Sequence, residues 1–143
     1  MRYVSSQKTE QEIQMAFESR LPDWTDISTH WLCLVIEEDK SYKSLGLIGF
    51  HLTTAEDGQK HAEVGYMIDP NHAGKGIATE ALSLLLSQER FKKICRFSGI
   101  VTQGNQASEK VLMNNGFYLH EIVEKNHEIN GVLYDDKIYL LNR

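Results

Sequence analysis

One segment constrains the fold of this chain more than any other. Residues 62–68 form an apolar run of the kind found in buried strands, and Asp69-Pro70 ends it. A turn with two glycines follows, Gly74 and Gly76, and from 77 to 91 the apolar residues recur with a helical period. A strand, a glycine turn and a helix in this order predict a helix packed on a sheet, which is a mixed α/β arrangement.

The spacing of apolar residues and the positions of turn-forming residues predict the other elements along the chain. The predicted order is helix 7–20, strands 31–36, 45–53 and 62–68, helix 77–91, strand 96–102, helix 106–114, and strands 117–125 and 132–141. The last two strands are joined at Asn130-Gly131, a strong signal for a hairpin turn. The 143 residues contain no repeat or linker, so we expect one domain that spans 1–143.

Charge and composition narrow the classes of function. Hydrophobic residues make up 41% of the chain and charged residues 24%, which is the balance of a globular protein. The formal net charge of -5 leaves no basic surplus for a nucleic-acid backbone, so no nucleic-acid partner is expected. The polar N-terminus lacks the apolar core of a signal peptide, and the longest apolar run, six residues, is too short to span a membrane. We therefore expect a cytoplasmic protein with no membrane partner.

The two cysteines, Cys33 and Cys95, both lie in apolar stretches. Free cysteine is among the most buried residue types, so we expect two buried, reduced thiols. A disulfide between them stays open as the alternative, because spacing alone does not decide pairing.

The turn around Gly74-Lys75-Gly76 has the chemistry of an anion site. Its glycines allow a tight turn and let a ligand approach the backbone without a Cβ in the way. The amides from Lys75 to Thr79 have no internal partners and stand at the positive end of a helix dipole. Such a row of N–H groups suits a pyrophosphate, and an ordinary strand-to-helix turn is the alternative. The spacing matches neither a P-loop nor a Gly-x-Gly-x-x-Gly turn.

Together with its neighbours, this turn resembles motif A of the GNAT superfamily of acetyltransferases. The motif reads Gln/Arg-x-x-Gly-x-Gly/Ala, and residues 73–78 match it at Gly76 and Ala78, with Ala73 in the first position. Further segments resemble the RimJ/RimL branch, which acetylates the N-termini of ribosomal proteins; they are 62–82, 105–117 and 128–135. The family pattern has a further strand and helix ahead of the segment at Gln7. We therefore expect a short variant or a truncated form that lacks the first strand.

The resemblance implies a fold and a co-substrate. The fold is a central mixed, mostly antiparallel sheet flanked by helices, in which strands 63–68 and 96–102 splay apart at their ends. Acetyl-CoA would enter this gap as co-substrate, without a metal, its pantetheine arm on backbone groups of Met67 and Ile68 and its pyrophosphate on the amides 74–78. The cofactor-binding residues implied are Met67, Ile68, Gly74, Lys75, Gly76, Ile77, Ala78, Thr79, Asn105 and Ser108.

Attack of an amine on a thioester benefits from a base and an acid. For the base we prefer Glu63, which opens the strand beside the cofactor and matches a carboxylate of several superfamily members; a surface carboxylate is the alternative. For the acid, many relatives use a tyrosine at the position that Leu112 occupies here. Ser108 is the candidate instead, and a helix cap after Asn105 is its alternative role. Tyr66 is expected to pack as a strand residue or to line the amine site.

The resemblance implies an acyl-CoA-dependent N-acetyltransferase that acts on a primary amine, most simply an N-terminal amine of a protein or peptide. A polyamine, an amino acid or an antibiotic is an alternative acceptor, since motif A does not contact it. A non-catalytic acyl-CoA-binding module and a nucleotide-binding protein are alternatives from other classes, and a homodimer stays open as an assembly.

Overall fold

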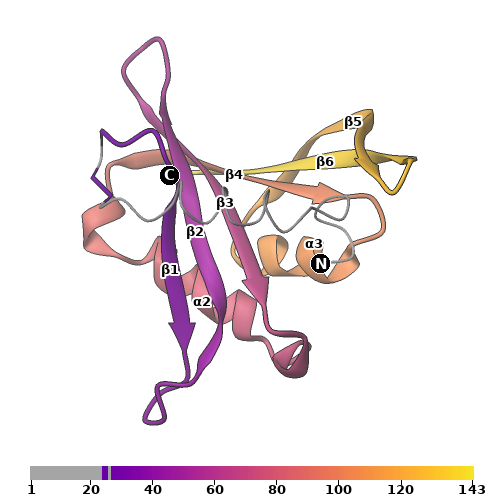
Figure 1. Cartoon of the computed structure of the whole chain (residues 1–143). Coiled ribbons are helices and arrows are strands. Elements are labelled where there is room, and N and C mark those ends of the chain that lie inside the picture. Colours follow the sequence, from indigo (N-terminus) through magenta and orange to yellow (C-terminus); the bar gives the residue numbers. More distant parts are fainter. Residues whose placement is uncertain (1–23, 26) are drawn as a thin grey trace.

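The computed structural model describes residues 24–25 and 27–143 (Figure 1). Its strands are β1 (Leu32–Glu37), β2 (Ser44–Thr54), β3 (Lys60–Ile68), β4 (Ile94–Thr102), β5 (Tyr118–Ile129) and β6 (Val132–Asn142). Its helices are α2 (Ile77–Leu86) and α3 (Gln106–Asn114), with 3-10 turns η1 (Pro70–His72) and η2 (Glu89–Phe91). The strands and helices predicted beyond residue 30 are confirmed in type and order, and the predicted helix 7–20 lies outside the described residues.

The described strands form one sheet in the order β1-β2-β3-β4-β6-β5. Within this sheet β3 and β4 run parallel, and the other neighbouring pairs are antiparallel. The connection between β3 and β4 passes through α2, because parallel strands need a crossover of this kind. The mixed, mostly antiparallel sheet expected from the sequence is therefore confirmed.

The two central strands, β3 and β4, are paired only over their first halves. Their pairing ends at Glu63 opposite Ser98, and beyond this point the strands part (Figure 1). Residues 64–68 of β3 stay paired with β2, and residues 99–102 of β4 stay paired with β6. The expected splay is confirmed, and each arm of the gap is held by a different neighbour.

Helix α2 is shorter than the predicted helix 77–91, because side chains compete for its last carbonyls. Ser87 Oγ and Gln88 Nε2 both donate to the carbonyl oxygen of Leu84, at 2.8 and 3.0 Å. Such local bonds replace the helical ladder. Gln88 is extended, at φ −66° and ψ 127°, and the chain continues as η2, which buries Phe91 in the core.

The core lies between the sheet and the helices α2 and α3, which share one face of it (Figure 1). Phe50 of β2, Phe97 of β4 and Leu82 of α2 are fully buried. Helix α3 comes close to β4 because Gly99 has no side chain: a Cβ there would lie 2.8 Å from both methyl carbons of Leu112. This contact holds α3 against β4 just beyond the point where β4 parts from β3.

A polar network ties α3 to β6. Glu109 Oε1 accepts hydrogen bonds from Lys137 Nζ and from the Tyr139 hydroxyl, each at 2.8 Å. The hydrogen bond from Lys137 holds the pKa of Glu109 below its ordinary value. Burial, reinforced by the Glu109 carboxylate, raises the pKa of Tyr139 to about 12. The network therefore favours the charged form of Glu109 and stabilises the fold where that form is present.

Replacing Glu109 by glutamine is expected to lower the free energy of unfolding by about 1 kcal/mol at neutral pH, since a charge-assisted hydrogen bond is lost. A depressed pKa contributes stability above the pKa of the unfolded chain and loses it as the pH falls through the folded one. The deficit should therefore shrink in acid, which urea denaturation at several pH values measures. Glu89→Gln is the control, because its ion pair with Lys92 is exposed. Equal deficits for both variants would contradict the prediction.

The thiols of Cys33 and Cys95 are less buried than the sequence predicts. Cys33 is exposed and Cys95 is half-buried, and both are free, so the reduced state is confirmed and the predicted burial is wrong. The reason is strand alternation: Leu32 points into the core, so its neighbour Cys33 points to the opposite face of β1.

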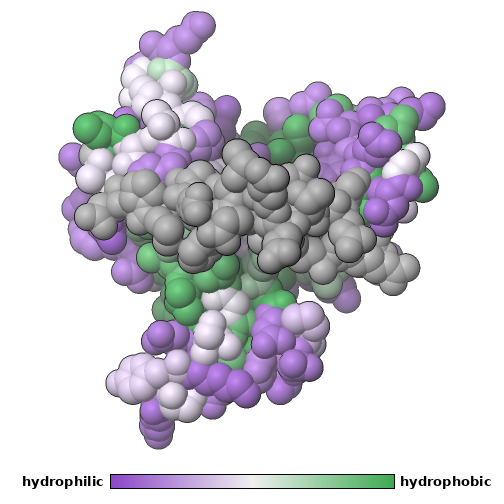
Figure 2. All heavy atoms as spheres, viewed as in Figure 1, coloured by the Kyte–Doolittle hydropathy of each residue, from purple (hydrophilic) through white to green (hydrophobic). Residues whose placement is uncertain are grey.

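The surface in Figure 2 is mixed, with hydrophilic residues over the hairpin tips and separate hydrophobic patches between them. Exposed apolar side chains include Val35 and Ile122 on the edge strands β1 and β5, and Leu133 on the neighbouring strand β6. Neither α2 nor α3, the α-helices in the described part of the chain, has the length and apolar character of a membrane span.

Candidate active site

The gap between β3 and β4 opens toward the glycine turn. After β3 the chain enters η1, where the Asp69 carboxylate accepts the Asn71 N–H at 3.0 Å and so caps the turn. Gly74 and Gly76 follow with φ of 80° and 75°, in the left-handed region that glycine adopts without strain. Local sequence therefore determines how the chain leaves the sheet and enters α2.

The start of α2 presents free amides. Gly76 occupies the N-cap position and has no side chain to satisfy them. The Glu80 N–H is bonded to the Gly76 carbonyl at 3.1 Å, so the N–H groups of residues 77–79 precede the first helical bond. A Cβ added at Gly74 or Gly76 would meet no described atom within 4 Å. The turn can therefore hold an anion against its backbone.

Met67 and Ile68 lie on the arm of the gap formed by β3. They pair with Leu47 and Gly46 of β2, so one edge of this stretch is satisfied. Among residues 24–25 and 27–143, no strand pairs with the opposite edge beyond Glu63. Backbone groups on that edge face the gap, where an extended ligand could take the place of a strand.

Glu63 lies where the gap begins. Its neighbours Ala62 and Val64 point into the core, so the Glu63 side chain points to the sheet face away from α2 and α3. Burial raises the pKa of Glu63, and the nearby His51, opposite it on β2, lowers it by less. A half-buried carboxylate with a raised pKa is suited to accept a proton.

Ser108 lies in the first turn of α3, on the helix side of the gap. The cap of this helix is Asn105, whose side-chain oxygen accepts the Ser108 N–H at 3.2 Å. The alternative in which Ser108 itself caps the helix is therefore wrong. The Ser108 side chain instead contacts Tyr66 of β3, with 2.7 Å between the two hydroxyl oxygens.

Sequence reasoning missed the contact that Tyr66 makes. Its ring packs against the core, and its hydroxyl also donates to the Ser108 carbonyl oxygen at 3.2 Å. Burial raises the pKa of Tyr66, which keeps the phenol protonated. Strand alternation could have placed the ring on the helix side, but nothing in the sequence names Ser108 as its partner.

Three further residues named in the sequence analysis lie in different parts of the structure. Lys75 is exposed beside the turn, and Leu112 is buried in the core. The Thr79 carbonyl accepts the Asn115 side-chain amide at 3.2 Å and so connects α2 to the end of α3. In the described part of the chain, no group of three His, Cys, Asp or Glu side chains is placed to hold a metal ion.

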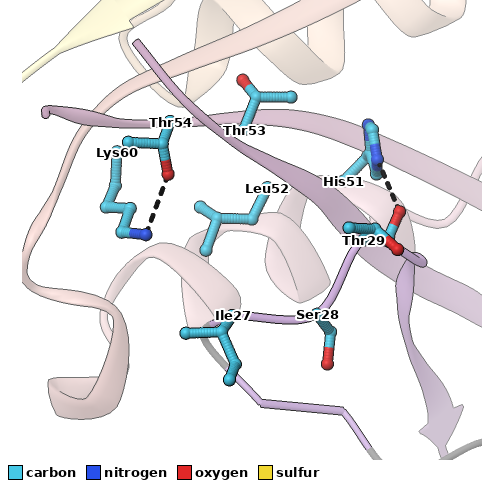
Figure 3. Close-up of a pocket in the computed structure, with 8 residues that line it drawn as sticks. All are labelled: Ile27, Ser28, Thr29, His51, Leu52, Thr53, Thr54 and Lys60. Atoms are coloured by element: carbon cyan, nitrogen blue, oxygen red, sulfur yellow. Dashed lines mark hydrogen bonds between the residues drawn. The ribbon is translucent and has the colours of Figure 1, made fainter. Parts of the chain in front are cut away.

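A separate pocket of about 450 Å³ lies at the start of β3 (Figure 3). The glycine turn follows the other end of this strand. It is lined by Ile27, Ser28, Thr29, His51, Leu52, Thr53, Thr54 and Lys60. Two of its polar groups already have partners: Lys60 Nζ donates to Thr54 Oγ1, and His51 Nε2 bonds to the Thr29 carbonyl, both at 2.9 Å. The gap and the glycine turn therefore form the stronger candidate site.

Known proteins resemble this chain in sequence. The model of the family described as acetyltransferase (GNAT) domain matches residues 1–118. The chain is 33% identical over 107 residues to the uncharacterized N-acetyltransferase YoaA of Bacillus subtilis (strain 168), which covers 73% of this chain and 58% of that protein. It is 29% identical over 113 residues to the ribosomal-protein-serine acetyltransferase of Escherichia coli (strain K12), 74% of this chain and 57% of that protein. The chain thus spans less than two thirds of these relatives.

Solved structures resemble it in fold. The microcin C7 self immunity acetyltransferase MccE, in complex with acetyl-CoA and AMP, has a TM-score of 0.69 at 30% identity, over 79% of this chain and 61% of its own. The ribosomal L7/L12 alpha-N-protein acetyltransferase RimL, in complex with coenzyme A, has a TM-score of 0.63 at 26% identity, over 71% and 56%. With its splayed central strands and a family match over most of its length, the chain belongs to the GNAT acetyltransferase domain family.

Proposed function

We propose that this chain transfers the acetyl group of acetyl-CoA to a primary amine in the cytoplasm. The observation that carries the proposal is the open glycine turn at the start of α2, directly beside the splay of β3 and β4. A ligand that ends in a pyrophosphate and continues as an extended amide chain matches this pair of features, because one binds anions and the other binds backbone-like groups.

In this proposal acetyl-CoA extends from the glycine turn into the gap between β3 and β4. The amides of residues 74–79 take the pyrophosphate, and Lys75 adds a cationic side chain at the surface. The backbone of Met67 and Ile68 binds the pantetheine arm, which brings the thioester between β3 and α3. Asn105 and Ser108 then line the far side of the thioester.

The chemistry requires a proton to leave the amine and another to reach the sulfur. Glu63 takes the first, directly or through water, from the sheet face away from the helices. A backbone N–H near the end of β3 stabilises the oxyanion of the tetrahedral intermediate. Ser108 supplies the second proton to the departing thiolate, whose ordinary pKa of about 8.5 makes the demand on this acid modest.

For the acceptor we favour the N-terminal amine of a protein. The support is the activity of two relatives, a ribosomal-protein-serine acetyltransferase and a ribosomal L7/L12 alpha-N-protein acetyltransferase. An N-terminal amine has an ordinary pKa near 8, so a larger share is already deprotonated at neutral pH than for a lysine side chain. A small cationic amine is the competing acceptor.

Release of free CoA thiol tests the proposal. Acetyl-CoA is offered with a panel of ribosomal-protein N-terminal peptides, polyamines, amino acids and aminoglycosides. Steady release that depends on a peptide amine is the expected result, and release with a small amine alone would correct the acceptor. Tight binding of acetyl-CoA without release across the panel would instead identify a binding module. A larger thermal shift with ATP or NAD than with CoA would identify a nucleotide-binding protein.

A further inference from the structure

The Tyr66 hydroxyl joins the two arms of the gap. Its strand, β3, remains paired with β2, whereas Ser108 belongs to α3, which packs on β4. The two hydroxyl oxygens lie 2.7 Å apart, the ordinary distance of an O–H···O hydrogen bond. A serine in the first turn of a helix can otherwise bond back to its own helix. Here Tyr66 takes its side-chain oxygen, so the rotamer of Ser108 is set from across the gap.

The protons in this contact can be counted. Tyr66 has one proton and two acceptors within reach, Ser108 Oγ at 2.7 Å and the Ser108 carbonyl oxygen at 3.2 Å. When the phenol donates to Oγ, the shorter contact, the proton of Ser108 is free to point elsewhere. A hydroxyl that accepts one hydrogen bond is also a better donor, because such chains polarise each other.

We infer that the Tyr66 hydroxyl orients the Ser108 hydroxyl to protonate the departing CoA thiolate, which makes Tyr66 a positioning residue for acetyl transfer. This inference rests on the proposed function. The amine nitrogen bonds to the carbonyl carbon, and the carbon–sulfur bond then breaks with its electron pair on sulfur. Sulfur takes the Ser108 proton, and Ser108 regains a proton from water. Glu63 takes the proton that the amine loses and passes it to water, so the protons balance. Tyr66 keeps its own proton throughout.

The base and the acid of this proposal, Glu63 and Ser108, lie on opposite faces of the sheet. The Glu63 side chain points away from the helices, whereas Tyr66 and Ser108 meet on the helix side. The nucleophile and the leaving group of a tetrahedral intermediate occupy different corners of the carbon. A base on one face and an acid on the other can therefore act on them without competing for the same space.

The test uses hydroxylamine as the nucleophile, because it is unprotonated near neutral pH and needs neither an acceptor site nor a base. Tyr66→Phe keeps the ring and removes only the hydroxyl. We expect kcat for CoA release to fall about tenfold, the rate equivalent of one hydrogen bond, with an unchanged KM for acetyl-CoA. Tyr139→Phe is the matched control: it removes another buried phenol hydroxyl, bonded to Glu109, and should leave kcat unchanged.

A double-mutant cycle separates positioning from a general structural effect. Because Tyr66 acts through Ser108, Tyr66→Phe combined with Ser108→Ala should be no slower than Ser108→Ala alone. A wild-type kcat in Tyr66→Phe, or losses that multiply in the double variant, would overturn the inference while leaving the proposed function intact. If the wild-type protein accelerates CoA release neither with hydroxylamine nor with any amine of the acceptor panel, the proposed function and the inference both fail.

Discussion

Replacing Gly76 by arginine is expected to weaken acetyl-CoA binding by roughly 100-fold, the loss of about two charge-assisted hydrogen bonds. The side chain would project from the N-cap of α2, where a Cβ now meets open space, into the region assigned to the pyrophosphate. Isothermal titration with CoA and with acetyl-CoA measures the effect. Because the loss concerns the diphosphate, both ligands should weaken by the same factor.

Gly58→Arg is the matched control for this variant. Gly58 lies in the turn between β2 and β3, at the other end of β3, with φ of 83° and open space around its Cβ position. Both substitutions therefore put arginine into left-handed backbone, at a cost of about 1–2 kcal/mol in stability, but one of them lies far from α2. Unchanged CoA affinity in Gly76→Arg, or an equal loss in Gly58→Arg, would contradict the placement of the pyrophosphate.

Replacing Glu63 by glutamine is expected to lower kcat about 100-fold near neutral pH, the ordinary contribution of a general base. The fold is retained, because glutamine has the shape of glutamate and the site is only half-buried. The deficit should shrink as the pH approaches the pKa of the amine, where the acceptor deprotonates without help. A peptide acceptor and a pH series of initial rates measure it.

The pH dependence of activity below neutral pH also depends on Glu63. Since burial raises the pKa of Glu63, the wild-type enzyme should lose activity on acidification at a higher pH than an exposed glutamate would produce. Glu56→Gln, in the exposed turn between β2 and β3, is the control and should leave the profile unchanged. If Glu63→Gln retains the wild-type pH profile, the base is another group or water.

The site divides into a part that local sequence predicts and a part that it does not. The glycine turn is readable because Gly74 and Gly76 both adopt positive φ, which other residues rarely do, and because a helical period begins directly after them. Glu63 is readable because it alternates with buried neighbours in an apolar strand. These features depend on a few adjacent residues, and the structure has them where the sequence predicts them.

Two other predictions, the burial of Cys33 and the end of α2, depended on contacts that the spacing of apolar residues does not reveal. The burial of Cys33 was predicted wrongly, because an apolar run does not say which face of an edge strand is covered. The predicted end of α2 is too late, since the sequence does not show that the exposed side chains of Ser87 and Gln88 bond to the Leu84 carbonyl oxygen. In both cases the contact that decides the outcome is not visible in the apolar pattern.

The amino-acid sequence by itself determined the order of the described elements and the position of the glycine turn, because residue propensity, apolar periodicity and glycine act within a few residues. Tertiary structure alone decided where β3 and β4 part and which groups meet at that point. Tyr66 and Ser108 are 42 residues apart in the chain, and their hydroxyls meet because α3 packs on β4, where Gly99 leaves room for Leu112. Such a contact depends on long-range packing, which no local pattern records.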